Sequence, residues 1–198
     1  MRYLKYIYFL IVLILLIIVT VTVQKWFAKP SQFNTNSATV IKELPSLNRL
    51  ETASFTLEKI IDNGSTGNQL QEILFGDRIL LIAHGEVIAG FDLATLSDKD
   101  VEVEDKTIRL TLPPPQILVT KLDNTQTRVY DRRQGILSKG DKDLEAKARS
   151  TAEQAIKEGA CKGNILEEAS KNARSQLTAL FRALGFTTIS IDIPQGSC

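Results

Sequence analysis

The chain has 198 residues, with 24 lysines and arginines against 23 aspartates and glutamates. Four of the basic residues and none of the acidic ones lie before residue 30, so residues 30–198 carry a net charge of about −3. This charge argues against a nucleic-acid-binding protein, which concentrates positive charge. The roughly 170 residues that remain are the size of one domain, which can bury a core without help from a metal or a disulfide framework.

Residues 6–24 form an uncharged run rich in Ile, Leu and Val. As a helix of about 1.5 Å per residue the run spans roughly 28 Å, close to the hydrocarbon thickness of a bilayer. A cleaved signal peptide needs small residues where the chain leaves such a run, whereas Trp26 and Phe27 stand there. Trp26, with tyrosines at the other end, is typical of the aromatic residues at membrane interfaces. We therefore expect residues 1–27 to be an uncleaved transmembrane anchor, with the lipid bilayer as partner.

The basic residues around this run are nearly balanced, because Arg2 and Lys5 precede it and Lys25 and Lys29 follow it. A short basic head before an apolar core is typical of a signal anchor. We therefore expect the N-terminus of this single-pass protein in the cytoplasm and its domain outside the cytoplasm. Residues 28–46 are polar and contain prolines, which predicts a flexible tether with a short helix, and residues 47–198 form the expected soluble domain.

Strand patterns fill the first part of the domain. Residues 78–92 carry apolar side chains on both faces, as in a central strand covered on both sides, and Gly85 and Gly90 within them predict a bulge or a bend. Three prolines at residues 113–115 end the segment before them. Runs of β-formers and period-two alternation predict strands over residues 50–61, 78–92, 101–112 with a turn at Asp105 and Lys106, 116–122 and 127–130.

The last third changes to helical periodicity. Apolar side chains, mostly alanine, form one stripe over residues 143–161, which predicts a helix that packs closely on its neighbour. Asn164 and Glu167 predict a capping box for a second helix, whose apolar stripe runs from Leu166 to Leu184 and includes Leu180. Residues 189–193 alternate as a last strand. This order predicts an α+β domain, in which a mixed, mainly antiparallel sheet packs against two C-terminal amphipathic helices and a last strand.

Three long segments, residues 74–93, 111–137 and 160–186, resemble in order and spacing a bacterial membrane-anchored family catalogued as domain of unknown function 4230. The resemblance covers residues 47–193 and implies a membrane-attached domain, with no catalytic role to transfer to individual residues. In architecture alone, a membrane-tethered α+β domain followed by a charged, alanine-rich helix also resembles the band-7 or prohibitin-homology scaffolds.

The chain has two cysteines, Cys161 in the first helical stretch and Cys198 as the last residue. Two are too few for a disulfide framework, and their spacing is not that of metal ligands. In an oxidising compartment a bridge between Cys161 and Cys198 would hold the C-terminus in place. The other interpretation, a buried Cys161 and a free terminal thiol, stays open.

His84 is the only histidine, so a cluster of histidine metal ligands is excluded and any catalytic triad would have to include this residue. Its place in an apolar strand favours a structural histidine, hydrogen-bonded in or near the core. If the segment around Tyr130 is extended, Arg128, Tyr130 and Arg132 share one face, where two guanidiniums can bind a carboxylate, a phosphate or a lipid headgroup. A solvated strand end, with Asp131 pairing an arginine, is the simpler interpretation.

The sequence contains neither the spacing of a phosphate-binding loop nor the ligand pattern of an EF-hand, and we expect no cofactor, no metal and no nucleic-acid partner. These absences favour a non-enzymatic interaction or scaffold protein at the cell membrane, which associates with itself or with an envelope protein. The alternative is a ligand-binding or hydrolytic domain with a pocket near His84, Arg128 and Arg132.

Overall fold

The computed structural model describes residues 15–16, 19–20, 48–64 and 68–198. The four described residues of the expected anchor are helical, and the rest of that run, like the expected tether at residues 28–46, lies outside the described residues. Within the described part of the chain no helix is long and apolar enough to cross a bilayer. The chain divides into two units, residues 1–34 and 35–198, and the second contains the elements described below.

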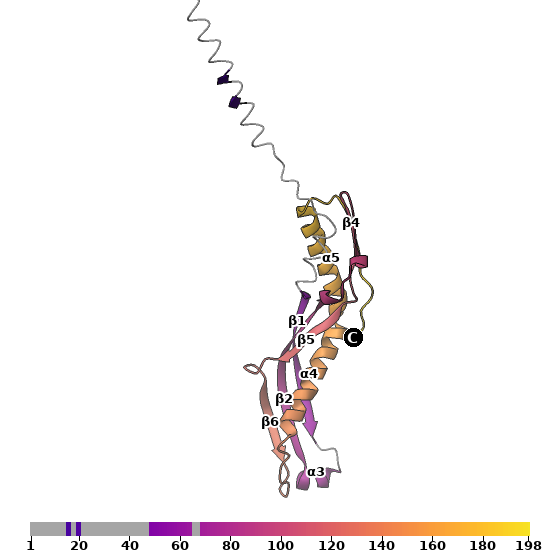
Figure 1. Ribbon diagram of the computed structural model, residues 1–198. Helices are drawn as coiled ribbons and strands as arrows, with labels where there is room; N and C mark the ends of the chain where they lie inside the picture. The colour runs from indigo at the N-terminus through magenta and orange to yellow at the C-terminus, as the bar shows by residue number, and fades with distance from the viewer. Residues whose placement is uncertain (1–14, 17–18, 21–47, 65–67) are drawn as a thin grey trace, which may run out of the picture. The chain divides into compact units, whose positions relative to one another are not determined.

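The second unit is a mixed α+β domain with an antiparallel sheet and two long C-terminal helices, as the sequence predicts (Figure 1). Two short 3-10 helices, Leu93–Thr95 and Asp98–Asp100, precede the third strand. In chain order the other elements are β1 (Arg49–Gly64), α3 (Gln69–Phe75), β2 (Asp77–Asp92), β3 (Val101–Glu104), β4 (Thr107–Thr111), β5 (Gln116–Leu122), β6 (Arg128–Gln134), α4 (Leu144–Lys162), α5 (Ile165–Ala183) and β7 (Thr188–Asp192).

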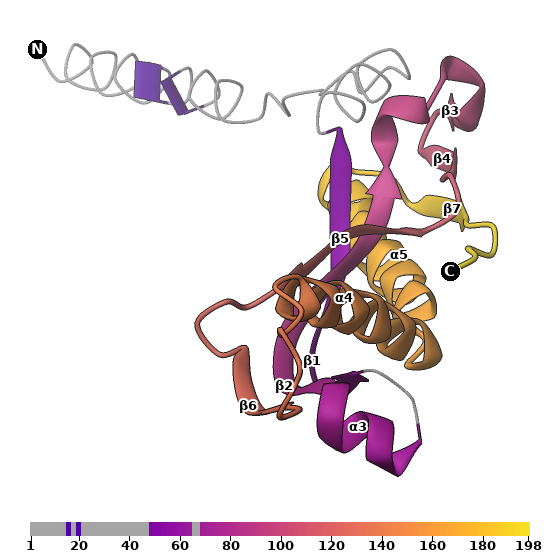
Figure 2. The same cartoon turned by 90° about the horizontal axis from the view of Figure 1, so that it is seen from below.

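Strand β2 is the centre of the larger sheet. β1 pairs with β2 antiparallel along its whole length, from Arg49 opposite Asp92 to Gly64 opposite Arg78. On the other edge of β2, β6 pairs with residues 77–82 and β5 with residues 85–90, both antiparallel. The sheet therefore has one long outer strand, β1, on one side and two shorter strands on the other (Figure 2).

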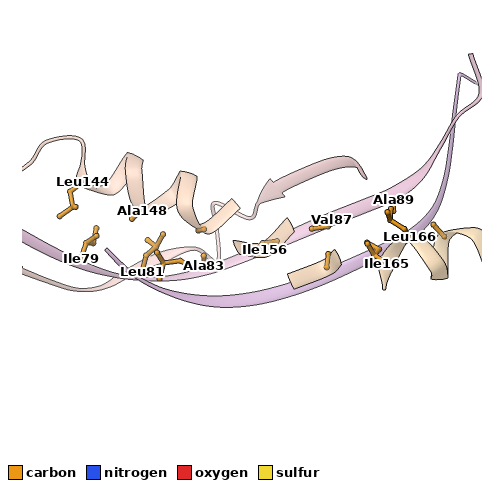
Figure 3. Close-up of a cluster of buried hydrophobic side chains, with 14 residues drawn as sticks. Ile79, Leu81, Ala83, Val87, Ala89, Leu144, Ala148, Ile156, Ile165 and Leu166 are labelled. Atoms are coloured by element: carbon orange, nitrogen blue, oxygen red, sulfur yellow. The ribbon is translucent and has the colours of Figure 1, made fainter. Parts of the chain in front are cut away.

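Among the described residues, helices cover only one face of this sheet. Alternate side chains of β2 are almost fully buried against α4 and α5, whereas the side chains between them, such as Leu80 and Ile82, are half-buried. The expectation of a strand covered on both faces is therefore wrong, because among the described residues no second layer packs on the open face of the sheet. Figure 3 shows the resulting core, which includes Ile79, Leu81, Ala83, Val87, Ala89, Leu144, Ala148, Ile156, Ile165 and Leu166.

Small residues let α4 approach β2 closely. The buried stripe of α4 is mostly alanine, and a Cβ added at Gly85 would lie 2.7 Å from the Cδ1 of Ile156. A Cβ at Gly90 would lie 2.0 Å from the carbonyl oxygen of Leu50, at the point where β1 bulges. The bulge expected within this strand at Gly85 or Gly90 is not found there: the extra residue opposite Gly90 belongs to β1, and Gly85 makes room for the helix.

A smaller second sheet extends the domain beyond the end of β2. β3 and β4 form an antiparallel hairpin, and β7 pairs parallel with β4. α5 runs from the first core onto this sheet, where Phe181 is 1% exposed and meets Phe186 edge to face. The sequence placed Leu180 and Leu184 in the buried stripe, but they are 46% and 40% exposed. The helix presents Phe181 instead, because its C-terminal half faces a different sheet from its N-terminal half.

The link between the two long helices differs from the expected capping box. Asn164 has a φ of 60°, and its side chain makes no capping hydrogen bond. Only Gly163 and Asn164 separate α4 from α5, and this short link places Asn164 in the left-handed region. A side chain that caps a helix start normally belongs to a residue with extended backbone, so the capping box does not form.

Candidate functional site

His84 lies on the face of the large sheet that the helices leave open. It stands directly opposite Glu58 of β1, and its Nε2 is 3.2 Å from the Oε2 of Glu58. The side chain is 22% exposed, so it is neither part of the core nor free in solvent. A histidine next to a carboxylate is an arrangement that can accept and transfer a proton.

The backbone of His84 is held by the turn that follows β5. The amide of Asp123 donates to the carbonyl oxygen of His84 at 2.8 Å. The hydroxyl of Thr127 lies 3.2 Å from both the amide nitrogen and the carbonyl oxygen of His84, accepting from the first and donating to the second. These bonds fix the position of the histidine relative to the loop between β5 and β6.

A polar hollow of about 420 Å³ opens beside this histidine. Three strands and the loop after β5 contribute to it, and most of the side chains that line it are polar or charged. Its lining residues are Thr56, His84, Gly85, Glu86, Lys121, Asp123 and Gln126. The hollow has the size of a small-ligand site, although such sites are usually more apolar.

Ion pairs and hydrogen bonds fix the charges in the hollow. Lys121 Nζ is 2.8 Å from Glu86 Oε2, and this contact, with a further hydrogen bond from Ser54, lowers the pKa of Glu86. The same pair raises the pKa of Lys121. Hydrogen bonds from Thr125 and Gln126 lower the pKa of Asp123 to about 2. At neutral pH the hollow therefore contains two carboxylates and one ammonium group besides the Glu58–His84 pair.

Arg128, Tyr130 and Arg132 do not share one face. β6 has a bulge at Tyr130, because Val129 pairs with Leu81 while Asp131 pairs with Leu80. Opposed residues of an antiparallel pair lie on the same face. Arg128, opposite Ile82, is therefore on the open face, whereas Arg132, opposite Ile79, is on the face of the helices. The expectation of two arginines around Tyr130 is wrong, because the inserted residue shifts the alternation by one.

Arg132 has a structural partner instead of an open position. Its guanidinium Nη2 lies 2.8 Å from Asp77 Oδ2 and also donates to the carbonyl oxygen of Asp141. The amide of Asp141 donates to Asp77 at 2.7 Å. The hydrogen bond from Arg132 lowers the pKa of Asp77, whose side chain is 8% exposed. This group joins the start of β2 to the segment before α4.

Asp77→Ala is expected to lower the free energy of unfolding by about 1–3 kcal/mol, because it removes the carboxylate that accepts from Arg132 and from the Asp141 amide. Since folding lowers the pKa of Asp77, its contribution is full above the ordinary value of 3.8 and is lost as the pH falls through the lower folded-state pKa. Urea titrations measure the change. The matched control is Asp131→Ala, whose partner Arg133 is 82% exposed, and it should cost less than about 0.5 kcal/mol. Equal losses would contradict a structural role of Asp77.

Two other hollows lack such an arrangement. One of about 650 Å³ is lined, as far as the described residues show, by side chains of α5, among them Lys171, Arg174 and Arg182. A smaller one of about 180 Å³ lies on the open face beside the Arg78–Asp62 ion pair. In the described ranges, no group of three or more His, Cys, Asp or Glu side chains could hold a metal ion.

The comparison with known families gives one match. The model of a family described as "Protein of unknown function (DUF4230)" matches residues 42–191. The chain belongs to this family. No curated protein and no solved structure matches it.

The DUF4230 region begins before β1 and ends within β7, so it contains both sheets and both long helices. His84 and every residue that lines its hollow lie within it. Cys161 is inside the DUF4230 region and Cys198 is outside it. The structure joins these two cysteines by a disulfide, with their Cα atoms 6.0 Å apart. The bridge links the end of α4 to the last residue of the chain.

Sequence reasoning missed most of the hollow. Glu86 could have been found, because it lies two residues after His84 and therefore on the same face of β2. Glu58, Lys121 and Asp123 come from other strands and their loop, and only the register of the sheet brings them to His84. The arrangement suits the binding of a small polar molecule, with the Glu58–His84 pair as the group able to transfer a proton.

Proposed function

We propose that this chain is a single-pass membrane protein whose α+β domain works by association, with other copies of itself or with another protein at the cell membrane. The uncharged run at residues 6–24 supports the anchor, because it has the length and composition of a transmembrane helix. Residues 28–46 are the proposed tether. In this role the domain is an interaction or scaffold module rather than an enzyme.

The outer edge of β1 is the observation that carries the proposal. Among the described residues only β2 pairs with β1, although β1 is 16 residues long. Alternate amide and carbonyl groups of such an edge point away from the sheet and can pair with another strand. α5 contacts β1 near Thr52, where the Thr52 hydroxyl donates to the carbonyl oxygen of Ala169 and Asn172 donates to the carbonyl oxygen of Thr52. From Ala53 onwards no strand of the described residues pairs with this edge, which can therefore take an added strand.

Charges on this edge test the proposal. In membranes that contain the full chain, chemical cross-linking is expected to give dimers or a complex with a second protein. The double variant Thr56→Lys and Ile60→Lys puts two like charges on the exposed side of β1 and should remove these products. The control Ser175→Lys and Gln176→Lys adds the same charge on the exposed surface of α5 and should leave them unchanged. Products that survive the β1 variant, or none from the parent chain, would contradict this interface.

We also propose that the domain lies on the extracytoplasmic side of the membrane. The Cys161–Cys198 disulfide supports this side, because such bridges persist in oxidising compartments. An impermeant thiol reagent applied to intact cells should label the two cysteines only after reduction. Labelling that requires disruption of the membrane, with or without reduction, would contradict the proposed side, whereas labelling of intact cells without reduction would contradict the bridge.

A second candidate function is the binding or hydrolysis of a small polar ligand. The hollow beside His84 and the contact of this histidine with Glu58 favour it. In a screen of small polar metabolites by thermal unfolding, a ligand of this site should raise the melting temperature of the parent chain and not that of His84→Ala or Lys121→Ala. Arg132 lies on the other face of the sheet, so the ligand should still raise the melting temperature of the control Arg132→Ala. The absence of any shift in the parent chain would exclude this candidate.

A further inference from the structure

A group of large apolar side chains is exposed at the end of the β1–β2 hairpin. They come from α3 and from the turn that follows β6, segments that lie at the same end of the domain in Figure 1. We call this surface the apolar tip. Its members and their exposed fractions are Leu70 (74%), Ile73 (59%), Leu74 (37%), Phe75 (59%), Ile136 (82%) and Leu137 (61%).

Backbone hydrogen bonds hold the two segments of the apolar tip together. The amide of Gly135 donates to the carbonyl oxygen of Gly76 at 2.7 Å, and the amide of Leu137 donates to the carbonyl oxygen of Leu74 at 2.8 Å. A Cβ at Gly135 would lie 2.7 Å from the carbonyl oxygen of Leu74, so only glycine allows this approach. The side chains therefore project from a fixed backbone, and their exposure is not explained by a loose loop.

Exposed apolar side chains of this number call for a binding partner. Soluble proteins usually expose large apolar residues singly, whereas a contiguous group marks a contact with a protein or a membrane. At the apolar tip two aliphatic side chains in the turn, Ile136 and Leu137, are more than 60% exposed. Residues that project in this way can enter the interface of a bilayer.

Basic residues flank the apolar tip. Residues 128–142 contain five lysines and arginines against two aspartates, in a domain that is acidic as a whole, although Arg132 and Arg133 are paired with Asp77 and Asp131. Lys139 and Lys142 follow the turn directly, and both are exposed. Two exposed lysines beside apolar side chains are complementary to a surface of anionic lipid headgroups.

We propose that the apolar tip docks on a lipid surface, with Ile136, Leu137 and Phe75 in the interface and Lys139 and Lys142 at the headgroups. The proposal rests on the membrane attachment proposed above and adds a second contact to it. β1 has 16 residues, which at about 3.3 Å each place the tip roughly 50 Å along the sheet from the point where the chain enters the domain. The domain would then either lie along its own bilayer or reach a facing one.

A fluorophore at the apolar tip tests this proposal in the full chain. An environment-sensitive dye is attached to Ile136→Cys under non-reducing conditions, which leave the Cys161–Cys198 bridge intact. The chain is placed as a single copy in nanodiscs of phosphatidylcholine, with or without phosphatidylglycerol. Protein-free vesicles of the same two compositions are then added. The control carries the dye at Leu184→Cys, an exposed apolar position directly after α5.

We expect the dye at position 136 to shift to shorter wavelengths with phosphatidylglycerol, in the nanodisc itself or after addition of vesicles, and the dye at position 184 not to shift. Lys139→Gln with Lys142→Gln should weaken the shift. No shift at position 136 in any arm would overturn the proposal. In a further arm with several copies per nanodisc, a shift that is absent from the single-copy and vesicle arms would also overturn it, since the partner would then be a second copy. The added vesicles report binding of the apolar tip even if the chain does not stay anchored in a membrane. Failure of the proposed anchor can therefore be distinguished from failure of the proposed tip contact.

Discussion

Phe181→Ala is expected to lower the free energy of unfolding by about 3–5 kcal/mol. Phe181 is 1% exposed in the core between α5 and the small sheet, and its ring meets that of Phe186 with centroids 6.1 Å apart. Removal of the ring leaves a cavity and also ends the aromatic contact, so the loss adds a packing term to the lost burial. Urea unfolding followed by circular dichroism measures the change.

The matched control for this prediction is the neighbouring residue of the same helix. Leu180 is 46% exposed, and Leu180→Ala should cost only about 1 kcal/mol, since about half of the side chain is already in solvent. A similar loss in both variants would contradict the position of α5 described here. It would mean that the stripe expected from the sequence, which contains Leu180, faces the core.

The second large effect is expected from the disulfide. Cys161 and Cys198 are 37 residues apart. In the chain-entropy account, a cross-link that closes a loop of this length lowers the entropy of the unfolded chain and so raises its free energy by about 4 kcal/mol. Cys161→Ser with Cys198→Ser should therefore lower the free energy of unfolding by about 2–4 kcal/mol. Denaturant titrations with and without reductant measure the effect.

Reduction of the parent chain should reproduce the loss seen in the double variant, and the double variant should not respond to reductant. We expect the variant to stay folded, because the tail also contacts the domain without the bridge. A Cβ at Gly196, for example, would lie 2.2 Å from the carbonyl oxygen of Pro115, so the tail lies directly on this loop. Equal stability of oxidised and reduced parent chain would contradict the bridge.

Local patterns predicted most of the elements. The strand expected at residues 78–92 is β2, Asp77–Asp92, and the helix expected at residues 143–161 is α4, Leu144–Lys162. Three prolines end the β3–β4 hairpin as expected, and Gly185, with a φ of 96°, follows the end of α5. These signals depend on neighbours in the sequence, which is why they can be read without the fold.

The features that sequence analysis missed depend on distant contacts. The three-stranded second sheet depends on the parallel pairing of β7 with β4, which are far apart in the sequence. α3 has only seven residues, and its apolar side chains face outwards, so it shows no core stripe. It becomes part of the apolar tip only because hydrogen bonds join it to the turn at residues 135–137.

The candidate site was predictable to a smaller extent. His84 was singled out as the only histidine, but its partner Glu58 is set by the register of β1 on β2. The grouping of Arg128 with Arg132 failed at a bulge, which a pattern of alternation cannot reveal. Sequence reasoning thus found single reactive residues and missed their surroundings.

Membrane fractionation of the full chain tests the central claim most directly. Membranes from cells that produce the chain are washed with sodium carbonate and then extracted with detergent. A matched variant carries Leu15→Lys and Val19→Lys, each of which costs about 2.5–3.5 kcal/mol near the centre of a membrane helix. We predict that the parent chain stays in the washed membranes until detergent is added, and that the variant is released. Recovery of the full-length parent chain in the detergent-free wash would contradict the anchor and the proposed function with it.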